Sequence, residues 1–401
     1  MPEPLSILCI ASYHKGQAFL REAKRQGARV YLVTSESLRE AEWPRESLDD
    51  IFFVRDDHKR WTIEDLLLGA SHLARRVAID RIVPLDDFDI EKASALREHL
   101  RVPGMGETTT RYFRDKLAMR MRARERGIDV PRFVHVLNEA AIRAFCQTVP
   151  APWVLKPRLS AGTIGIKKVA SEADLWPLID SLGDQASYYL LEEFIAGDVY
   201  HVDSLVDHSR VLAAFTSRYG TPPFEVSHGG GVFTTQLLPR ASADDRAALK
   251  TNRAVLAALG LVRGVSHTEF IKSTDGQWFF LETSARVGGA HIVELIEAAT
   301  GANFWHEWAK IELAGGETPY LVPDLRKDYA GLITCLTKDE RPDLTPFDAP
   351  EVVWRLDKAH HAGLIVASPS HARVAALVDD YARRLAGGYS TFIPPGDKPH
   401  D

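Results

Sequence analysis

The chain has 401 residues, of which 45% are hydrophobic and 26% are charged. This length exceeds one ordinary hydrophobic core, so we expect two or three domains, and the composition argues against long disordered segments. The net charge of −6 lacks the basic excess of nucleic-acid-binding proteins, and the three cysteines lack the spacing of a zinc site or a disulfide framework. Since neither a signal peptide nor a run of 18 apolar residues is recognisable, we expect a cytoplasmic protein with no membrane partner.

Apolar segments alternate with amphipathic segments over residues 1–105. Uninterrupted apolar runs between helices predict a parallel sheet that helices cover on both faces, which is a doubly wound α/β domain. The predicted strands end near Ser12, His14, Asp86 and Asp87. Ligands bind beyond the carboxyl ends of such strands, but the first strand-to-helix turn lacks a GxGxxG pattern, so no dinucleotide site is predicted. We expect strands at 5–12, 28–35 and 80–87, and helices at 14–27, 62–78 and 89–100.

A helix is predicted to end at Gly127, because Pro131 prevents its continuation. This helix carries Lys116 and a series of alternate arginines, which we expect to form a solvated face. The arginines are Arg120, Arg122, Arg124 and Arg126. A strand, a helix and a second strand follow, so residues 106–186 are predicted to form an α+β unit.

The segment VLKPRLSAGTIGIKKV places Lys156 at the end of an apolar strand and follows it with small residues. A loop that contains Ser160, Gly162 and Thr163 can bring backbone N–H groups against phosphate oxygens, because glycine adds no side chain. Lys156 and Lys116 could then contact the α- and β-phosphates of one nucleotide. The alternative is a surface hairpin turn, since the lysine precedes the glycines and the GxxxxGK[ST] pattern is missing.

Antiparallel strands dominate residues 187–318, and the first of them are expected to form a meander. These strands are predicted at 187–195, 199–207 and 210–220. Within LLEEFIAG, Glu192 and the backbone of Ile195 could bind an adenine ring at the strand end. The alternative is a plain edge strand on which Glu192 and Glu193 are solvated.

Glu269 and Glu282 lie on two further strands that a tight turn joins. Buried carboxylates are usually paired or bound to a metal, so the two acids predict a Mg²⁺ site between phosphates. The alternative is that strand alternation turns each side chain outward. Arg286 precedes a glycine pair that includes Gly289 and a predicted helix, an arrangement suited either to binding an anion or to a surface salt bridge.

The order of these elements resembles the ATP-grasp superfamily over about residues 1–315, and the most specific segments are VLKPRLSAGTIGI and LETSARVGG. The resemblance implies an α/β and α+β multidomain fold, in which a doubly wound parallel sheet precedes a two-subdomain ATP-grasp fold. It implies an N-terminal domain at 1–105, a small subdomain with the glycine-rich loop at 106–186, a large subdomain at 187–318 and a C-terminal α+β extension at 319–401.

The resemblance also implies the cofactors ATP and Mg²⁺, with Mn²⁺ as a substitute, and a role for each site residue. It assigns phosphate contacts to Lys116 and Lys156, and the mobile loop to Ser160, Gly162 and Thr163. It assigns adenine contacts to Glu192, Glu193 and Ile195, and metal ligation to Glu269 and Glu282. Arg286 and Lys156 would stabilise charge on the transferred phosphate.

Two positions depart from the superfamily pattern. Ser284 stands where an asparagine is the usual third metal ligand, and a hydroxyl is a weaker oxygen ligand. Val199 stands where a glutamate usually binds the ribose, and the adjacent Asp198 could replace it. These departures leave open a nucleotide-binding regulatory protein without turnover.

The segment LETSARVGGAHIVELIEAATGANFW is most similar to carboxylate–amine ligases and L-amino acid ligases. That likeness implies that a small-molecule carboxylate and an amine are joined through an acyl phosphate, with release of ADP and phosphate. Predicted substrate contacts are Arg218, His228, Gly230, Arg286 and Gly289. A carboxylating or formyl-transferring enzyme of small-molecule metabolism is the enzymatic alternative. By analogy with such enzymes we expect a homodimer.

Overall fold

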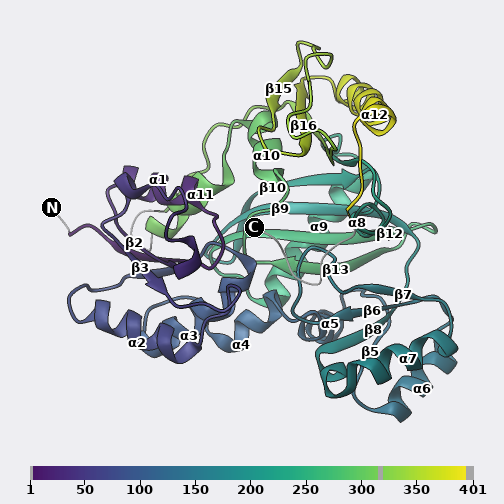
Figure 1. Cartoon of the computed structure of the whole chain (residues 1–401), viewed down its shortest axis with the longest axis horizontal. Helices are drawn as coiled ribbons and strands as arrows, with labels where there is room; N and C mark the ends of the chain where they lie inside the picture. The colour runs from purple at the N-terminus through teal and green to yellow at the C-terminus, as the bar shows by residue number, and fades with distance from the viewer. Residues whose placement is uncertain (1–2, 315–318, 394–401) are drawn as a thin grey trace.

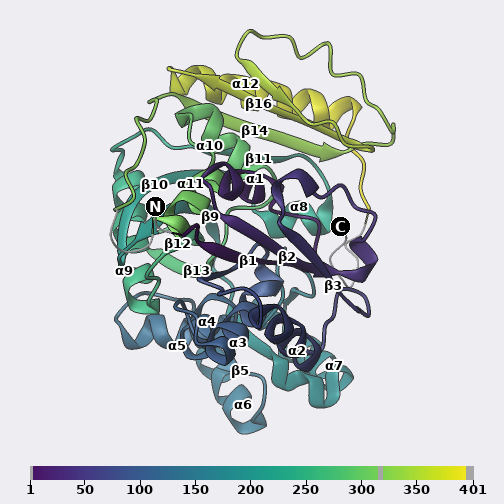
Figure 2. The same ribbon diagram turned by 90° about the vertical axis from the view of Figure 1, so that its left-hand side faces the viewer.

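The computed structural model describes residues 3–314 and 319–393 and contains three β-sheets (Figure 1). A four-stranded sheet belongs to the N-terminal domain, a second four-stranded sheet to a small subdomain, and an eight-stranded sheet to the rest of the chain. Turning the molecule by 90° places the N-terminal domain in front of the larger sheet (Figure 2). None of the described helices is long and apolar enough to cross a membrane.

The N-terminal sheet is parallel, as the sequence predicts, and its strand order is β3-β2-β1-β4. Alternate residues of β1 pack on opposite faces, with Ile7 and Cys9 against α1 and α11, and Leu8 and Ile10 against α2 and α3. The edge strand β3 was not predicted, because its short segment is only half-buried and lacks a long apolar run. The bounds are β1 Ser6–Ala11, β2 Arg29–Ser35, β3 Asp50–Val54, β4 Arg81–Pro84, α1 Gln17–Arg25, α2 Ile63–Ala74 and α3 Ile90–Leu100.

The small subdomain has an antiparallel sheet of order β5-β8-β6-β7. Because β8 pairs with β5 and β6, the predicted meander through residues 187–220 is wrong at its first strand, and the small sheet extends past residue 186 to Glu193. The bounds are α4 Glu107–Thr110, α5 Lys116–Glu125, β5 Phe133–His135, α6 Glu139–Thr148, β6 Trp153–Pro157, β7 Lys167–Val169, α7 Glu172–Leu182 and β8 Tyr189–Glu193.

The large sheet has the order β13-β12-β9-β10-β11-β14-β16-β15, so strands of the C-terminal extension continue it (Figure 2). The described part of the predicted extension, 319–393, therefore shares a sheet with the large subdomain, and residues 394–401 lie outside the described residues. The strand bounds are β9 Gly197–Asp207, β10 Arg210–Tyr219, β11 Phe233–Leu237, β12 Gly264–Ser273, β13 Trp278–Ser284, β14 Tyr329–Leu336, β15 Val352–Arg355 and β16 His361–Ser368. The helices are α8 Pro223–Gly229, α9 Ala243–Leu259, α10 Ile292–Thr300, α11 Phe304–Leu313 and α12 His371–Gly388.

Candidate functional site

The small sheet lies beside the β12–β13 edge of the large sheet (Figure 1). Residues of both sheets line a cavity of about 440 Å³. Lys156 and Glu192 line it from the small sheet, and Glu269 and Glu282 line it from the large sheet. Its other lining residues include the apolar side chains of Val154, Ile166, Ile195, Val199, Ile271 and Leu281. The cavity therefore offers charged groups and an apolar surface to one ligand, which is the combination that small-molecule sites use.

The glycine-rich loop starts in contact with the N-terminal end of α5. The Arg114 guanidinium donates to the Leu159 carbonyl at 2.6 Å, and Lys116 Nζ donates to the Ser160 carbonyl at 2.6 Å. Between them, Asp115 forms an ion pair with Arg158. Lys116 is thus held beside the loop, although the two segments are about forty residues apart in the sequence.

The same loop contacts the large subdomain at its tip. Gly162 and Thr163 have positive φ angles of 68° and 66°, a conformation that glycine adopts readily and threonine rarely. Thr163 Oγ1 donates to Ser227 Oγ of α8 at 2.7 Å. Because β6 and β7 form an antiparallel pair, the segment is a hairpin, and its loop residues Ser160 and Thr163 line the cavity.

The small sheet buries three charges next to the cavity. Glu192 Oε2 lies 2.5 Å from Lys156 Nζ, and Glu192 Oε1 lies 2.6 Å from Arg120 Nε. Burial lowers the pKa of Lys156 to about 8, against the opposing attraction of Glu192. Burial alone would raise the pKa of Glu192, but Arg120 and then Lys156 hold it below its usual range. The expectation that Arg120 lies on a solvated face is wrong, because Glu192 compensates its charge in the interior.

The predicted adenine contacts differ in their surroundings. Glu192 is a buried counterion for two cations, as described above. Glu193 lines the cavity and accepts two hydrogen bonds from Arg132, at 2.6 and 2.8 Å. Ile195 follows the strand and also lines the cavity. Adenine binding by these residues stays a prediction.

Glu269 and Glu282 occupy directly opposed positions on β12 and β13. Tyr219 donates to Glu269 Oε1 at 2.9 Å, and His267 Nε2 lies 3.5 Å from the same oxygen. Glu282 Oε2 lies 3.2 Å from Lys116 Nζ. Two carboxylates across adjacent strands form an oxygen donor set that fits Mg²⁺, which takes carboxylate and phosphate oxygens.

A buried hydrogen-bonded network supports Glu269 from beneath. Asp203 lies between two imidazoles, with His201 Nδ1 at 2.7 Å and His267 Nδ1 at 2.8 Å from its two oxygens. The two imidazoles hold the pKa of Asp203 well below its usual range despite burial. Burial opposes protonation of His267, but Asp203 outweighs it and raises the pKa of His267 to about 9.

Within residues 3–314 and 319–393, His201, Asp203 and His267 are the only group of three or more His, Cys, Asp or Glu residues whose ligand atoms lie within 4.8 Å of one another. Because their facing nitrogen and oxygen atoms bond to one another, we interpret them as a support for Glu269. His201 and Asp203 were not predicted, although their alternate spacing in VYHVDSLVD places both on one face of β9.

A smaller cavity of about 30 Å³ adjoins the first and shares Lys116, Ser160 and Glu282 with it. Arg286 and Asp87 line this smaller cavity. Arg286 donates to the Val287 carbonyl at 2.6 Å, and Arg114 donates to Asp87 Oδ2 at 2.7 Å. Burial opposes ionisation of Asp87, but Arg114 and then Arg286 lower the pKa of its carboxyl.

Ser284 contacts the N-terminal domain rather than the opposed carboxylates. Its hydroxyl donates to Asp87 Oδ1 at the carboxyl end of the parallel sheet. This contact brings a predicted strand end of the N-terminal domain to the site. Ligation of a metal by Ser284 stays a prediction.

Several predicted residues lie away from the two cavities. Asp198 and Arg218 form a 2.8 Å ion pair with each other, and alternation along β9 places Asp198 on the opposite face from Val199, which lines the main cavity. His228 Nδ1 lies 3.0 Å from the Phe224 carbonyl within α8. A side chain at Gly230 would contact Phe392.

Gly289 has open space where a side chain would point. Among the predicted substrate residues, only Arg286 lines either cavity. Near them in the chain, Phe224 and Glu225 of α8 line the main cavity. Substrate binding by the remaining residues stays a prediction.

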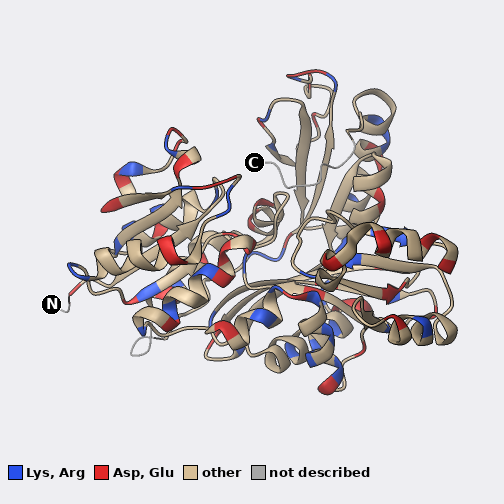
Figure 3. Cartoon of the chain, turned by 60° about the horizontal axis from the view of Figure 1, so that its bottom comes forward, with Lys and Arg blue, Asp and Glu red and all other residues tan. Residues whose placement is uncertain are grey.

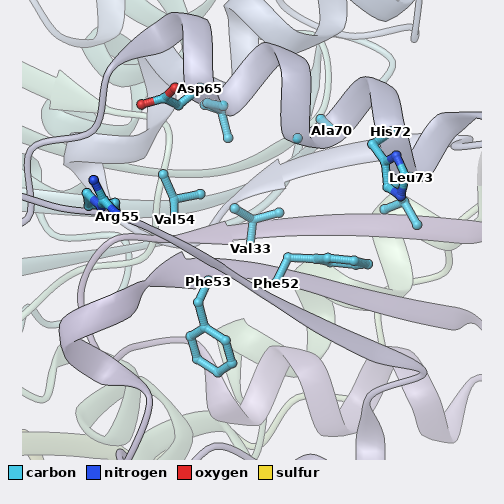
Figure 4. Close-up of a pocket in the computed structure, with 11 residues that line it drawn as sticks. Val33, Phe52, Phe53, Val54, Arg55, Asp65, Ala70, His72 and Leu73 are labelled. Atoms are coloured by element: carbon cyan, nitrogen blue, oxygen red, sulfur yellow. The ribbon is translucent and has the colours of Figure 1, made fainter.

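A separate cavity of about 490 Å³ lies between β3 and α2 in the N-terminal domain (Figure 4). Val33, Phe52, Val54 and Leu73 give it a mainly apolar wall. None of the predicted site residues lines it, and it has no paired carboxylates or lysine. We therefore place the candidate site at the junction of the sheets rather than here.

Comparison with known proteins identifies the class to which this site belongs. Residues 149–294 match the ATP-grasp domain family, which confirms the predicted resemblance over this part of the chain. The chain is distantly related to amino acid ligases. The L-arginine-specific L-amino acid ligase of Bacillus subtilis is 24% identical over 272 residues, which are 66% of this chain and 64% of that ligase. The chain therefore covers slightly less than two thirds of that relative.

Solved structures confirm the predicted fold class. An L-amino acid ligase from Bacillus licheniformis has a TM-score of 0.74 at 18% identity, covering 98% of this chain and 100% of that chain. The biotin carboxylase domain of the Hydrogenobacter thermophilus 2-oxoglutarate carboxylase, solved with MgADP, has a TM-score of 0.69 at 16% identity, covering 96% of this chain and 90% of that chain. At these identities the likeness establishes a shared fold.

Proposed function

We propose that this protein is an ATP-dependent carboxylate–amine ligase that forms an amide or peptide bond and releases ADP and phosphate. The observation that carries the proposal is that Lys116, Lys156, Glu269 and Glu282 line one cavity that also has an apolar surface. The related amino acid ligase of Bacillus subtilis supports the choice of reaction class.

The first proposed step transfers the γ-phosphoryl group of ATP to a carboxylate. A carboxylate oxygen attacks the γ-phosphorus, the bond from phosphorus to the β,γ-bridging oxygen breaks, and ADP leaves. In this proposal Lys156 and Lys116 would contact the phosphates, and Arg286 would stabilise charge on the transferred group. Glu269 and Glu282 would hold Mg²⁺, which neutralises phosphate charge when it is bound.

The second step forms the carbon–nitrogen bond. The amine nitrogen attacks the acyl carbon, the bond from that carbon to the phosphate oxygen breaks, and phosphate leaves as the nitrogen loses a proton. Positioning and charge stabilisation are sufficient for both steps, so no protein nucleophile is required. The contact from Thr163 to Ser227 holds the loop over the cavity, and such closure would protect the acyl phosphate from water.

Phosphate release by the purified protein with Mg²⁺-ATP tests the proposal against a matrix of carboxylates and amines. We expect release that requires one compound of each class, and Glu282→Gln and Lys156→Ala should each lower it by roughly 100-fold or more. Glu340→Gln, a change of the same type at an exposed residue, is the matched control.

Three results would contradict the proposal in different ways. ATP binding without release in any combination would favour a regulatory protein. Release that requires bicarbonate or formate would favour a carboxylating or formyl-transferring enzyme. Phosphate release that is unchanged in both variants would show that the active site is not in the cavity lined by Lys156 and Glu282.

A further inference from the structure

A third, larger cavity of about 1110 Å³ opens between the N-terminal domain and the glycine-rich loop. It continues from the smaller cavity, since Arg114, Ser160 and Ala161 line both. Ser160 also lines the proposed nucleotide cavity, so the three cavities follow one another. We call the third cavity the interdomain groove.

The order of the cavities determines which part of the reaction the groove serves. Lys156 lines the proposed nucleotide cavity, and Arg286 lines the small cavity beside it. The proposed function assigns the transferred phosphate to Arg286. A cavity of about 30 Å³ is far smaller than the cavities on either side of it, so it has room for a reacting group but not for a whole substrate. The remainder of a phosphoryl acceptor would therefore extend into the interdomain groove.

The groove carries an excess of positive charge. Lys59, Arg60, Lys92 and Arg114 line it together with one carboxylate, that of Glu91. This local excess differs from the rest of the chain, where acidic and basic residues are interspersed over the surface and the net charge is −6 (Figure 3). A cleft lined by one sign of charge selects ligands of the opposite sign.

Two of the cations already have anionic partners. Arg114 donates to Asp87 at 2.7 Å, and Lys92 Nζ lies 2.9 Å from Asp89 and 5.0 Å from the centre of the Trp61 ring. The Arg60 guanidinium, in contrast, has no hydrogen bond, ion pair or ring contact with any residue described in 3–314 and 319–393. Arg60 is exposed and lines the groove, so its guanidinium is accessible to an anionic group bound there.

We infer that the groove binds a second, negatively charged group of the acceptor through Arg60, so that the substrate class is an extended acid with at least two anionic groups. The inference rests on the proposed function, since it takes the acceptor from the proposed reaction. One carboxylate would react in the small cavity, and the second anionic group would bind Arg60. Trp61 and Phe88 would pack against the part of the acceptor between them.

Binding of matched probes tests the inference on the full chain saturated with Mg²⁺ and a non-hydrolysable ATP analogue. The probe pairs are L-glutamate with L-glutamine and O-phospho-L-serine with L-serine, because the members of each pair share a backbone and differ in side-chain charge. Calorimetry should show up to about fivefold tighter binding of the anionic member, as expected for an ion pair with an exposed guanidinium. Arg60→Glu should remove that preference, and Arg60→Gln should reduce it.

Arg383→Glu is the matched control, because Arg383 is highly exposed on α12 and makes the same change of charge. Absence of any charge-dependent binding in both pairs, or a preference that survives Arg60→Glu, would overturn the inference.

Measuring phosphate release distinguishes failure of the inference about Arg60 from failure of the proposed function. If binding depends on Arg60 but no acid gives phosphate release, the groove binds anions as inferred and the proposed ligase activity is wrong. If acids without a second anionic group give amine-dependent phosphate release, and Arg60→Glu leaves that release unchanged, the ligase activity is supported and anion binding by Arg60 is wrong.

Discussion

The two sheets that enclose the nucleotide cavity bury opposite kinds of charge. On the small sheet, Glu192 serves two cations, Lys156 and Arg120, so that wall has an excess of positive charge. On the large sheet, Glu269 lies above the Asp203 network and opposite the carboxylate of Glu282. The small sheet is therefore suited to phosphate and the large sheet to a divalent cation. Different sheets would thus recognise the two halves of a metal–nucleotide complex.

The comparison depends most strongly on Glu192. Replacing it with leucine would leave two cations buried without their anion, and removal of one partner from such a group costs about 3–5 kcal/mol in the free energy of unfolding. Denaturant unfolding of Glu192→Leu measures this loss. Adding Arg120→Leu should recover part of it, because that variant removes one of the two unpaired charges.

Glu193→Gln provides the matched control for this prediction. Its partner Arg132 is about half exposed, so the pair contributes at most about 1 kcal/mol. If Glu192→Leu keeps normal stability and loses only ATP affinity, Glu192 binds the nucleotide directly and the small sheet does not require it as a counterion.

The second prediction concerns the pH dependence of ATP binding. Burial lowers the pKa of Lys156 to about 8, so the free protein loses this cation as the pH rises through that value. Phosphate binds the protonated form, and the dissociation constant for Mg²⁺-ATP should therefore increase about tenfold between pH 7 and pH 9. Calorimetry at several pH values measures this change.

Lys156→Arg separates the lysine from other titrating groups, because arginine stays protonated over this range. The variant should show a flatter profile between pH 7 and pH 9, even if its affinity is lower. The same tenfold change in both proteins would show that Lys156 is not the group that titrates.

The smallest expected effect lies where the small subdomain contacts the large one. Ser227→Ala removes the acceptor of the Thr163 hydroxyl without changing either sheet. One neutral hydrogen bond contributes about 1 kcal/mol, so KM for ATP should rise about fivefold or less and the unfolding midpoint should stay unchanged. Steady-state kinetics with varied ATP measures this effect. A loss of activity comparable to that of Lys156→Ala would make loop closure a dominant requirement.

The sequence predicted the parallel N-terminal sheet and several cavity residues for separate physical reasons. Uninterrupted apolar strands require cover on both faces, which the helices of the N-terminal domain provide. Lys156 and its glycine-rich loop were recognisable because small residues after a charged strand end are unusual. Glu269 and Glu282 were recognisable because carboxylates stood within apolar strands.

Contacts between segments that are distant in the sequence decided how the charged residues around the cavity are paired. The pairing of β8 with β6 places Glu192 beside Lys156, and no local pattern indicates that Arg120 completes this group. The alternate spacing of His201 and Asp203 indicates a shared face of β9, but only the pairing with β12 places His267 beside them. The sequence by itself therefore indicated most of the elements and several of the residues that line the cavity. The tertiary structure decided which charges are paired, because a buried charge is compensated by whichever partner the fold brings within a few ångströms.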